Sequence, residues 1–185
     1  MPEFAIKPLT ASPQTLDALA DILVETVAAG GSVHFLHPLA HADARGFWAK
    51  ALAAAARGER IVLGAYDGET LISTVSLLLD TPPNQQHRAE IGKMMTHPRH
   101  RGRGAAAALL AEAERLAVEN GRTLLNLDTA ADGGASGLYE KTGYVFAGSI
   151  PDFAYKPRGG LTATRIYWKK IGANPPLPLR GRGLG

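Results

Sequence analysis

The chain has 185 residues, of which 45% are hydrophobic, and it carries a net charge of +3. This composition predicts one globular domain with a sizeable core, and no apolar run is long enough to cross a bilayer, so we expect a cytoplasmic protein. The sequence contains no cysteine, which excludes disulfides, thiolate metal sites and a cysteine nucleophile.

The first third of the chain is expected to hold a strand and two helices. The strand is expected at 4–9. Ser12 followed by Pro13 indicates a helix start, because a serine oxygen accepts a bond from a free first-turn amide and proline suits the first helical position. Glycines at 30–31 end that helix, and a second helix is expected at 43–57.

Three histidines, His34, His37 and His41, lie between these helices at spacings that a helical metal site uses. Pro38 interrupts the helical face, and no carboxylate or thiol at ligand spacing completes a set. We therefore expect no metal site, and we expect the imidazoles to line or flank a pocket.

The middle of the chain contains a hairpin and then a segment with unusual turn chemistry. Strands are expected at 60–66 and 70–79, because the Asp-Gly pair at 67–68 is a strong hairpin signal. The segment 89–120 reads as a strand, a turn rich in arginine and glycine, and an amphipathic helix from Ala105.

The turn before that helix suits a phosphate group. The first amides of a helix have no partner within it, and the aligned peptide dipoles add about half a positive charge there. Gly102 and Gly104 leave the backbone bare, and Arg99, Arg101 and Arg103 raise the positive potential. The pattern favours the pyrophosphate of a nucleotide-containing cofactor, although glycine and arginine also form ordinary solvated turns.

A further strand is expected at 123–128, where alternation places Asn126 and Asp128 on one face. Asp132 is expected to cap a short helix that reaches Tyr139. The strand and short helix bring two polar side chains and a tyrosine into the region that follows the phosphate turn.

The chain closes with strands at 144–150 and 161–169, separated by a loop at 151–160. This order predicts an α/β (α+β) fold in which a mixed central sheet of about seven strands is flanked by about four helices. We expect a single domain over 1–171 and a flexible tail rich in proline and glycine over 172–185.

Two spaced motifs are specific. Residues 99–104 (RHRGRG) fit the pattern R/Q-x-x-G-x-G/A, and residues 135–144 (ASGLYEKTGY) fit A-x-x-L-Y-x-x-x-G-F/Y. Both are signatures of the GNAT acyl-CoA N-acyltransferases, which this chain resembles. The resemblance implies the GNAT fold, with the sheet splayed between its two central parallel strands, and acetyl-CoA as the cosubstrate without a metal.

The resemblance also implies how the cofactor is held. Backbone groups on the strand before the turn would pair with the pantetheine arm, and amides of the turn would hold the pyrophosphate. Asp132 stands where many relatives have a cofactor-binding asparagine, although a helix cap is the alternative. The candidate cofactor residues are Met94, Met95, Thr96, Arg99, Arg101, Gly102, Arg103, Gly104, Ala105 and Asp132.

The chemistry of acyl transfer to an amine needs a proton acceptor and a proton donor. Without cysteine, we expect direct attack of the amine in a ternary complex. The family places its tyrosine near the sulfur, so Tyr139 is the candidate acid, with Glu90 as the candidate base and Asp128 assisting or orienting the amine. The alternative for Glu90 is a carboxylate paired with Arg88 or Lys93.

Other functions compete with this hypothesis. Residues 102–107 also fit G-x-G-x-x-G/A, and Asp128 lies where a dinucleotide-binding fold places its ribose-binding acid, which would indicate an NAD-linked oxidoreductase. Five residues separate the strand from Gly102, which argues against that fold, since its turn is immediate. A third possibility is a catalytically inactive module that binds acyl-CoA.

The acceptor is expected to be a small-molecule amine, and detoxification of an antibiotic or toxin is one role that fits. The basic residues are not interleaved with aromatic ones, so we expect no nucleic acid partner. We expect no membrane partner either, and we consider a homodimer possible.

Overall fold

The computed structural model describes residues 4–172, so the predicted tail lies outside the described residues from residue 173 on. The strands are β1 (Ala5–Pro8), β2 (Arg60–Asp67), β3 (Thr70–Leu78), β4 (Arg88–Thr96), β5 (Leu124–Ala130), β6 (Val145–Tyr155) and β7 (Leu161–Lys170). The helices are α1 (Pro13–Ala28), α2 (His41–Ala56), α3 (Ala105–Glu119) and α4 (Ser136–Lys141), with short 3₁₀ turns η1 (Pro83–Gln85) and η2 (Pro98–His100).

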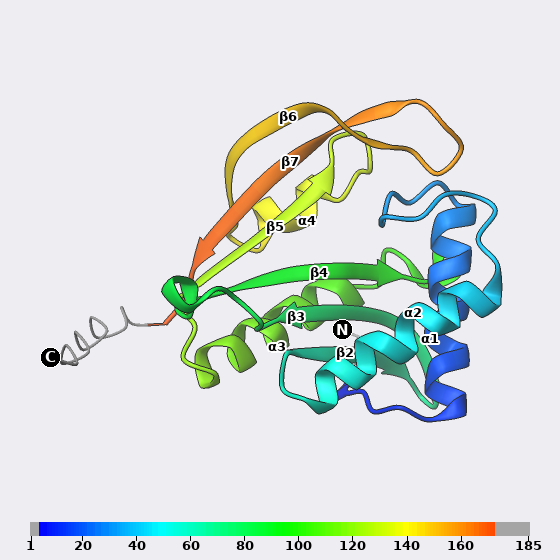
Figure 1. Ribbon diagram of the computed structural model, residues 1–185, viewed down its shortest axis with the longest axis horizontal. Helices are drawn as coiled ribbons and strands as arrows, with labels where there is room; N and C mark the ends of the chain where they lie inside the picture. The colour runs from blue at the N-terminus through cyan, green and yellow to red at the C-terminus, as the bar shows by residue number, and fades with distance from the viewer. Residues whose placement is uncertain (1–3, 173–185) are drawn as a thin grey trace, which may run out of the picture.

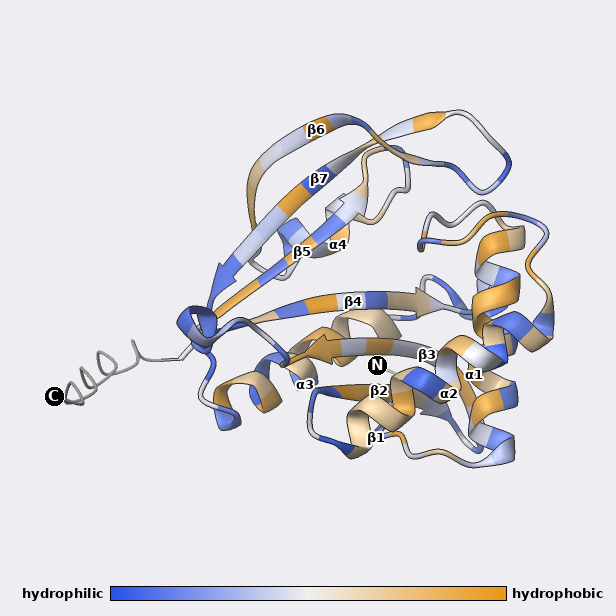
Figure 2. Ribbon diagram, in the orientation of Figure 1, coloured by the Kyte–Doolittle hydropathy of each residue, from blue (hydrophilic) through white to orange (hydrophobic). Residues whose placement is uncertain are grey.

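The strands form one sheet in the order β1-β2-β3-β4-β5-β7-β6 (Figure 1; β1 is labelled in Figure 2). Among the residues described, β4 and β5 are the parallel pair and their neighbours run antiparallel. This mixed sheet with four helices confirms the predicted fold. It contradicts the dinucleotide-binding alternative, which needs a mainly parallel sheet with repeated helical crossovers.

Two hydrophobic clusters hold the helices against opposite faces of the sheet. On one face, Leu109 and Leu110 of α3 pack with Ile72 of β3 and with residues of β5 and α4. On the other face, α1 and α2 pack with β2 and β3, and Trp48 of α2 is fully buried there. The β3 ribbon is hydrophobic along much of its length (Figure 2), because both of its faces are covered.

Three element boundaries lie where local signals in the sequence predict them. Ser12 caps α1 by accepting a bond from the amide of Thr15 at 3.0 Å, with Pro13 in the first turn. The β2–β3 turn places Gly68 at φ +59°, a conformation that favours glycine. Helix α3 begins at Ala105, as predicted.

The prediction for the last loop was wrong in its length. Residues 151–155, expected in a loop, extend β6 to Tyr155, and the register with β7 slips between Ile150 and Ala154. Such an irregularity lets a strand accommodate Pro151 at the edge of a sheet, where its missing N–H is tolerated. The connection that is left is the short turn at 156–160.

No helix within residues 4–172 is both long enough and apolar enough to span a bilayer.

Candidate active site

The central feature of the site is the early separation of β4 from β5. These strands pair through Arg88–Leu124, Ala89–Leu125 and Glu90–Asn126. Beyond Glu90, β4 pairs with β3 across an irregularity at Gly92–Met95, where Lys93 has φ +50°. A bulge increases local twist, which turns β4 away from β5 (Figure 1). We call the space between the diverging strands the splay.

The separation exposes a backbone edge of β4. His97 donates its N–H to the Ile72 carbonyl on β3, and Ser73 donates its hydroxyl to the Met95 carbonyl at 2.8 Å. Because successive residues of a strand alternate in direction, the backbone groups of Met94 and Thr96 face away from β3 and toward the splay. This edge fits the predicted pairing with a pantetheine arm, which carries amide groups of its own.

The β4 edge ends at the bare N-terminus of α3. Gly104 is the N-cap with φ +91° and makes no side-chain cap bond, and Gly102 has φ +75°. A Cβ atom built on either glycine meets nothing within 4 Å. The exposed backbone at 101–104 therefore leads into a fifteen-residue helix whose first amides have no partner within the helix, and together they form the kind of cradle that a pyrophosphate requires.

The three arginines of this turn have different partners. Arg103 donates to the Asp67 carboxylate at 2.6 Å, which lowers the pKa of that carboxyl by hydrogen bonding. Arg101 donates to the Thr96 carbonyl at 3.3 Å. Arg99 lines a pocket of about 200 Å³ that also contains carboxylates of α1, so its side chain lies on the α1 side of the turn. The backbone of the turn is thus better placed than its guanidinium groups to contact an anion.

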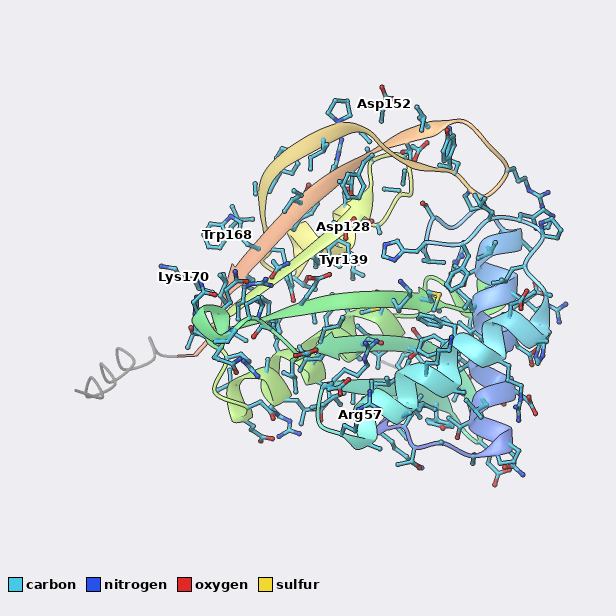
Figure 3. The ribbon with its side chains drawn as sticks, in the orientation of Figure 1. Arg57, Asp128, Tyr139, Asp152, Trp168 and Lys170 are labelled. Atoms are coloured by element: carbon cyan, nitrogen blue, oxygen red, sulfur yellow. The ribbon has the colours of Figure 1, made fainter. Side chains whose placement is uncertain are left out.

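Tyr139 and Asp128 lie on the β5 side of the splay (Figure 3). Tyr139 is buried against Tyr144 and Tyr167, and burial, with a smaller effect of Asp128, raises the pKa of Tyr139 to about 12. Asp128 accepts a bond from the Thr164 hydroxyl at 2.8 Å. The phenol therefore stays protonated at neutral pH, as a proton donor must.

Glu90 is the last residue of β4 that pairs with β5. The alternative in which Glu90 pairs with Arg88 is not observed among residues 4–172, where the Arg88 guanidinium donates to Gln85 and to Asn126. Among residues 4–172, no ion pair within 4.0 Å joins Glu90 to Lys93. The carboxylate at the closed end of the splay is therefore not neutralised by a contacting cation.

Asp132 does not cap a helix, contrary to the prediction. Helix α4 begins at Ser136 with Ala135 as its N-cap, three residues beyond Asp132. Asp132 instead accepts a bond from the Thr162 hydroxyl at 2.8 Å and pairs with Lys156 at 3.2 Å. Hydrogen bonds from these two partners lower the pKa of Asp132, so the group is anionic at neutral pH.

Sequence reasoning missed Lys93 as a residue of the site. Its Nζ lies 2.8 Å from Nδ1 of His34, one of the histidines expected to line or flank a pocket. Gly92, directly before Lys93 within a strand pattern, is the signal that could have indicated the bulge. The contact itself joins residues 59 positions apart and has no local signal.

Two loops meet across the open end of the splay. The amide of His37, between α1 and α2, donates to the Pro157 carbonyl of the β6–β7 turn at 2.8 Å. Arg158 of the same turn donates to the Ala28 carbonyl at 3.0 Å. The segments before α2 and after β6 thus border one side of the site together (Figure 1).

The three histidines do not form a cluster. His34 contacts Lys93, whereas His41 contacts Asp21 of α1 at 3.1 Å. Within residues 4–172, no group of three histidine, aspartate or glutamate side chains is arranged to hold a metal ion.

Comparisons with known proteins place this geometry in one class. Residues 23–144 match the acetyltransferase (GNAT) family. The fold is similar to an N-acetyltransferase from Staphylococcus aureus Mu50, with 20% identity, a TM-score of 0.77, and coverage of 92% of this chain and 99% of that one. For a ribosomal-protein-alanine N-acetyltransferase from Brucella melitensis the identity is 22%, the TM-score 0.76, and the coverage 90% and 99%.

A third similar structure contains the cofactor. It is a GNAT superfamily phosphinothricin acetyltransferase from Sinorhizobium meliloti in complex with acetyl-CoA, with 17% identity, a TM-score of 0.78, and coverage of 94% of each chain. The splay and bare helix start define an acetyltransferase that uses acetyl-CoA. The chain belongs to the GNAT acetyltransferase family.

The bare helix start generates a testable prediction. Replacing Gly104 with valine forces a β-branched residue to φ +91° and fills the cradle, so we expect at least tenfold weaker binding of acetyl-CoA by calorimetry. Gly121→Val is the matched control, because Gly121 follows the same helix at φ +72° with nothing within 4 Å. Equal affinities in Gly104→Val and Gly121→Val would contradict this position for the pyrophosphate.

Proposed function

We propose that this protein transfers the acetyl group of acetyl-CoA to the primary amine of a small molecule, by direct attack in a ternary complex. The observation that carries the proposal is the open edge of β4. It leads from the bare amides of α3, through Thr96 and Met94, to the carboxylate of Glu90. A cofactor lying along this edge would have its diphosphate at one end and its acyl group near a proton acceptor.

The cofactor residues follow from that path. Backbone groups of Met94 and Thr96 would hold the pantetheine arm, and the amides of residues 101–105 would hold the pyrophosphate. We leave Met95 out of the predicted set, because its backbone pairs with β3 and its carbonyl accepts the Ser73 hydroxyl. Arg99 would contribute positive potential at the turn. We leave Asp132 out of the set, because its anionic side chain is bound by Thr162 and Lys156 and would repel phosphate.

The proton transfers can be assigned to three side chains. Glu90 removes a proton from the incoming ammonium group, directly or through water, and Asp128 orients that group. The neutral nitrogen attacks the thioester carbon, and the C–S bond breaks as the carbonyl reforms. Tyr139 then donates its proton to the departing thiolate, and the second proton that the nitrogen loses as the amide forms restores the Tyr139 hydroxyl through solvent. The products are an N-acetylated amine and free coenzyme A.

The choice of a small acceptor rests on resemblance. Segments 88–90, 124–129 and 151–169 are similar to those of the tabtoxin resistance protein, an acetyltransferase that inactivates a toxin containing a β-lactam. The Sinorhizobium meliloti relative is a phosphinothricin acetyltransferase, whereas the Brucella melitensis relative acts on a ribosomal protein alanine. The tabtoxin resistance protein and the phosphinothricin acetyltransferase support detoxification of an antibiotic or toxin as the role of this protein.

A homodimer stays a prediction. Strand β6 is an edge of the sheet, and it exposes large apolar side chains of the kind that subunit contacts bury. These side chains are Val145, Phe146, Ile150, Phe153 and Tyr155.

The proposed activity is tested by release of coenzyme A thiol from acetyl-CoA with a panel of primary amines. Because the chain has no cysteine, a thiol reagent reports only the coenzyme. We expect release with at least one small amine. Binding of acetyl-CoA without release for any amine would support the inactive acyl-CoA-binding module instead.

Loss of the Tyr139 hydroxyl should slow the reaction. In Tyr139→Phe the thiolate leaves without a proton donor, so we expect kcat to fall by about 10²-fold or more. Tyr144→Phe is the control, because Tyr144 is also buried and its ring packs edge-on against the ring of Tyr139. An equal fall in both variants would assign the effect to packing of the tyrosines.

Glu90→Gln should change the pH dependence of kcat/KM. A carboxylate accepts a proton only when it is ionised, so activity that depends on it is lost as the pH falls. Glutamine cannot accept the proton, and the rise of kcat/KM with pH should move to the higher range where the amine deprotonates by itself. The rate at neutral pH should fall by about 10²-fold to 10⁴-fold. An unchanged profile would remove Glu90 from the mechanism.

A further inference from the structure

Two strained residues meet beside the splay. Among the described residues, the non-glycine positions with positive φ are His34 (+74°), Lys93 (+50°) and Asp152 (+52°). The first two touch through their side chains, although 59 positions separate them in the chain. Such conformations are unfavourable for residues with a side chain, and they cluster at active sites, ligand sites and switch regions where the surrounding structure enforces them.

When Lys93 is protonated, its contact with His34 assigns a role to each side chain. An ammonium group has only donors, so Lys93 Nζ donates to Nδ1 of His34 over 2.8 Å. His34 is therefore neutral, with its proton on Nε2. Burial and the neighbouring Lys93 charge both lower the pKa of His34, which keeps the ring neutral at physiological pH. The pair therefore has hydrogen-bond donors left for a ligand, namely the Nε2–H of His34 and the remaining N–H groups of Lys93.

Lys93 has no anionic contact of its own. Within residues 4–172 it forms no ion pair within 4.0 Å, and its Nζ lies 5.6 Å from the centre of the Phe47 ring. The carboxylates of Asp128 and Glu90 lie beyond ion-pair distance and raise the pKa of Lys93, whereas the charge of Arg60 lowers it. Burial is the largest effect and lowers the pKa of Lys93, so the protein does not fully compensate for removing this charge from water.

An uncompensated, partly buried ammonium group is stabilised when a ligand brings an anion to it. Building on the proposed function, we propose that Lys93 and His34 form an anion subsite, and that the acceptor is an amine that also carries a carboxylate or a similar anionic group. Glu90 and Asp128 then face the ammonium end of the acceptor, and Lys93 and His34 face its anionic end. An amino acid or an analogue of one has this charge pattern.

Lys93 could instead act as a proton acceptor, because a lysine with a lowered pKa can serve as a general base. Arginine separates the two roles. It keeps the positive charge and its donors but does not lose its proton in proteins, so Lys93→Arg retains anion binding and cannot act as a base.

The subsite is tested with matched acceptors. The assay compares natural amino acids with their primary amides as acceptors. It is run on wild-type enzyme, Lys93→Met and Lys93→Arg, and the control is Lys50→Met, which changes an exposed lysine of α2. The acid and the amide present the same amine, and the amide differs by lacking the anionic group. Acetyl-CoA affinity and the thermal midpoint of each variant establish that the fold and the cofactor site are intact.

We expect wild type and Lys50→Met to prefer acids over amides in kcat/KM. In Lys93→Met that preference should fall by about tenfold to 100-fold, through a higher KM for the acid, as expected for loss of a hydrogen bond to a charged group. Lys93→Arg should restore part of it. If Lys93→Met does not fold, His34→Gly provides the second test, since glycine tolerates φ +74° and removes the imidazole.

Three results would overturn the subsite. The first is that wild type uses acids and amides equally well, and the second is that it acetylates neither but acetylates other amines. The third is that Lys93→Met loses the same fraction of kcat with acid and with amide, and that Lys93→Arg loses it too. Each of these leaves the acetyltransferase activity demonstrated. Failure of the proposed function is distinct, because no amine would then release coenzyme A thiol.

Discussion

The parting of β4 and β5 after three paired residues is the constraint on which the site depends. Backbone amides and carbonyls inside a protein need partners, and a strand that leaves its neighbour needs them from elsewhere. The bulge at Lys93 produces this departure and leaves the backbone of Met94 and Thr96 facing the splay. The same edge connects Glu90 at the closed end with the first amides of α3 at the open end.

The rest of the fold supports this arrangement by packing on both faces of the sheet. Separate hydrophobic clusters hold α3 and α4 on one face of the sheet and α1 and α2 on the other. The loop before α2 and the turn after β6 close one side of the splay through the His37–Pro157 hydrogen bond. The anion subsite lies where this loop approaches the bulge, so cofactor and acceptor would reach the reacting centre from different elements.

Much of the fold was predictable, because its signals are local. The Ser12-Pro13 pair, the Asp67-Gly68 turn and the glycines before α3 each act within a few residues. Predictions failed where tertiary partners decided the outcome. Asp132 has the chemistry of a helix cap, but Thr162 and Lys156 bind it and α4 begins four residues later, at Ser136. Pairing with β7 also extends β6 through a segment that reads as a loop.

The sequence by itself determined the element order and the family motifs, because each depends on residues that lie close together in the chain. It also excluded a cysteine nucleophile, because the chain contains no cysteine. Only the tertiary structure decided which side chains meet. The contact between Lys93 and His34 depends on a bulge in one strand and on the path of a distant loop. Hydrophobic periodicity reports which face of an element is buried, and it holds no information about which distant polar group will be placed opposite that element.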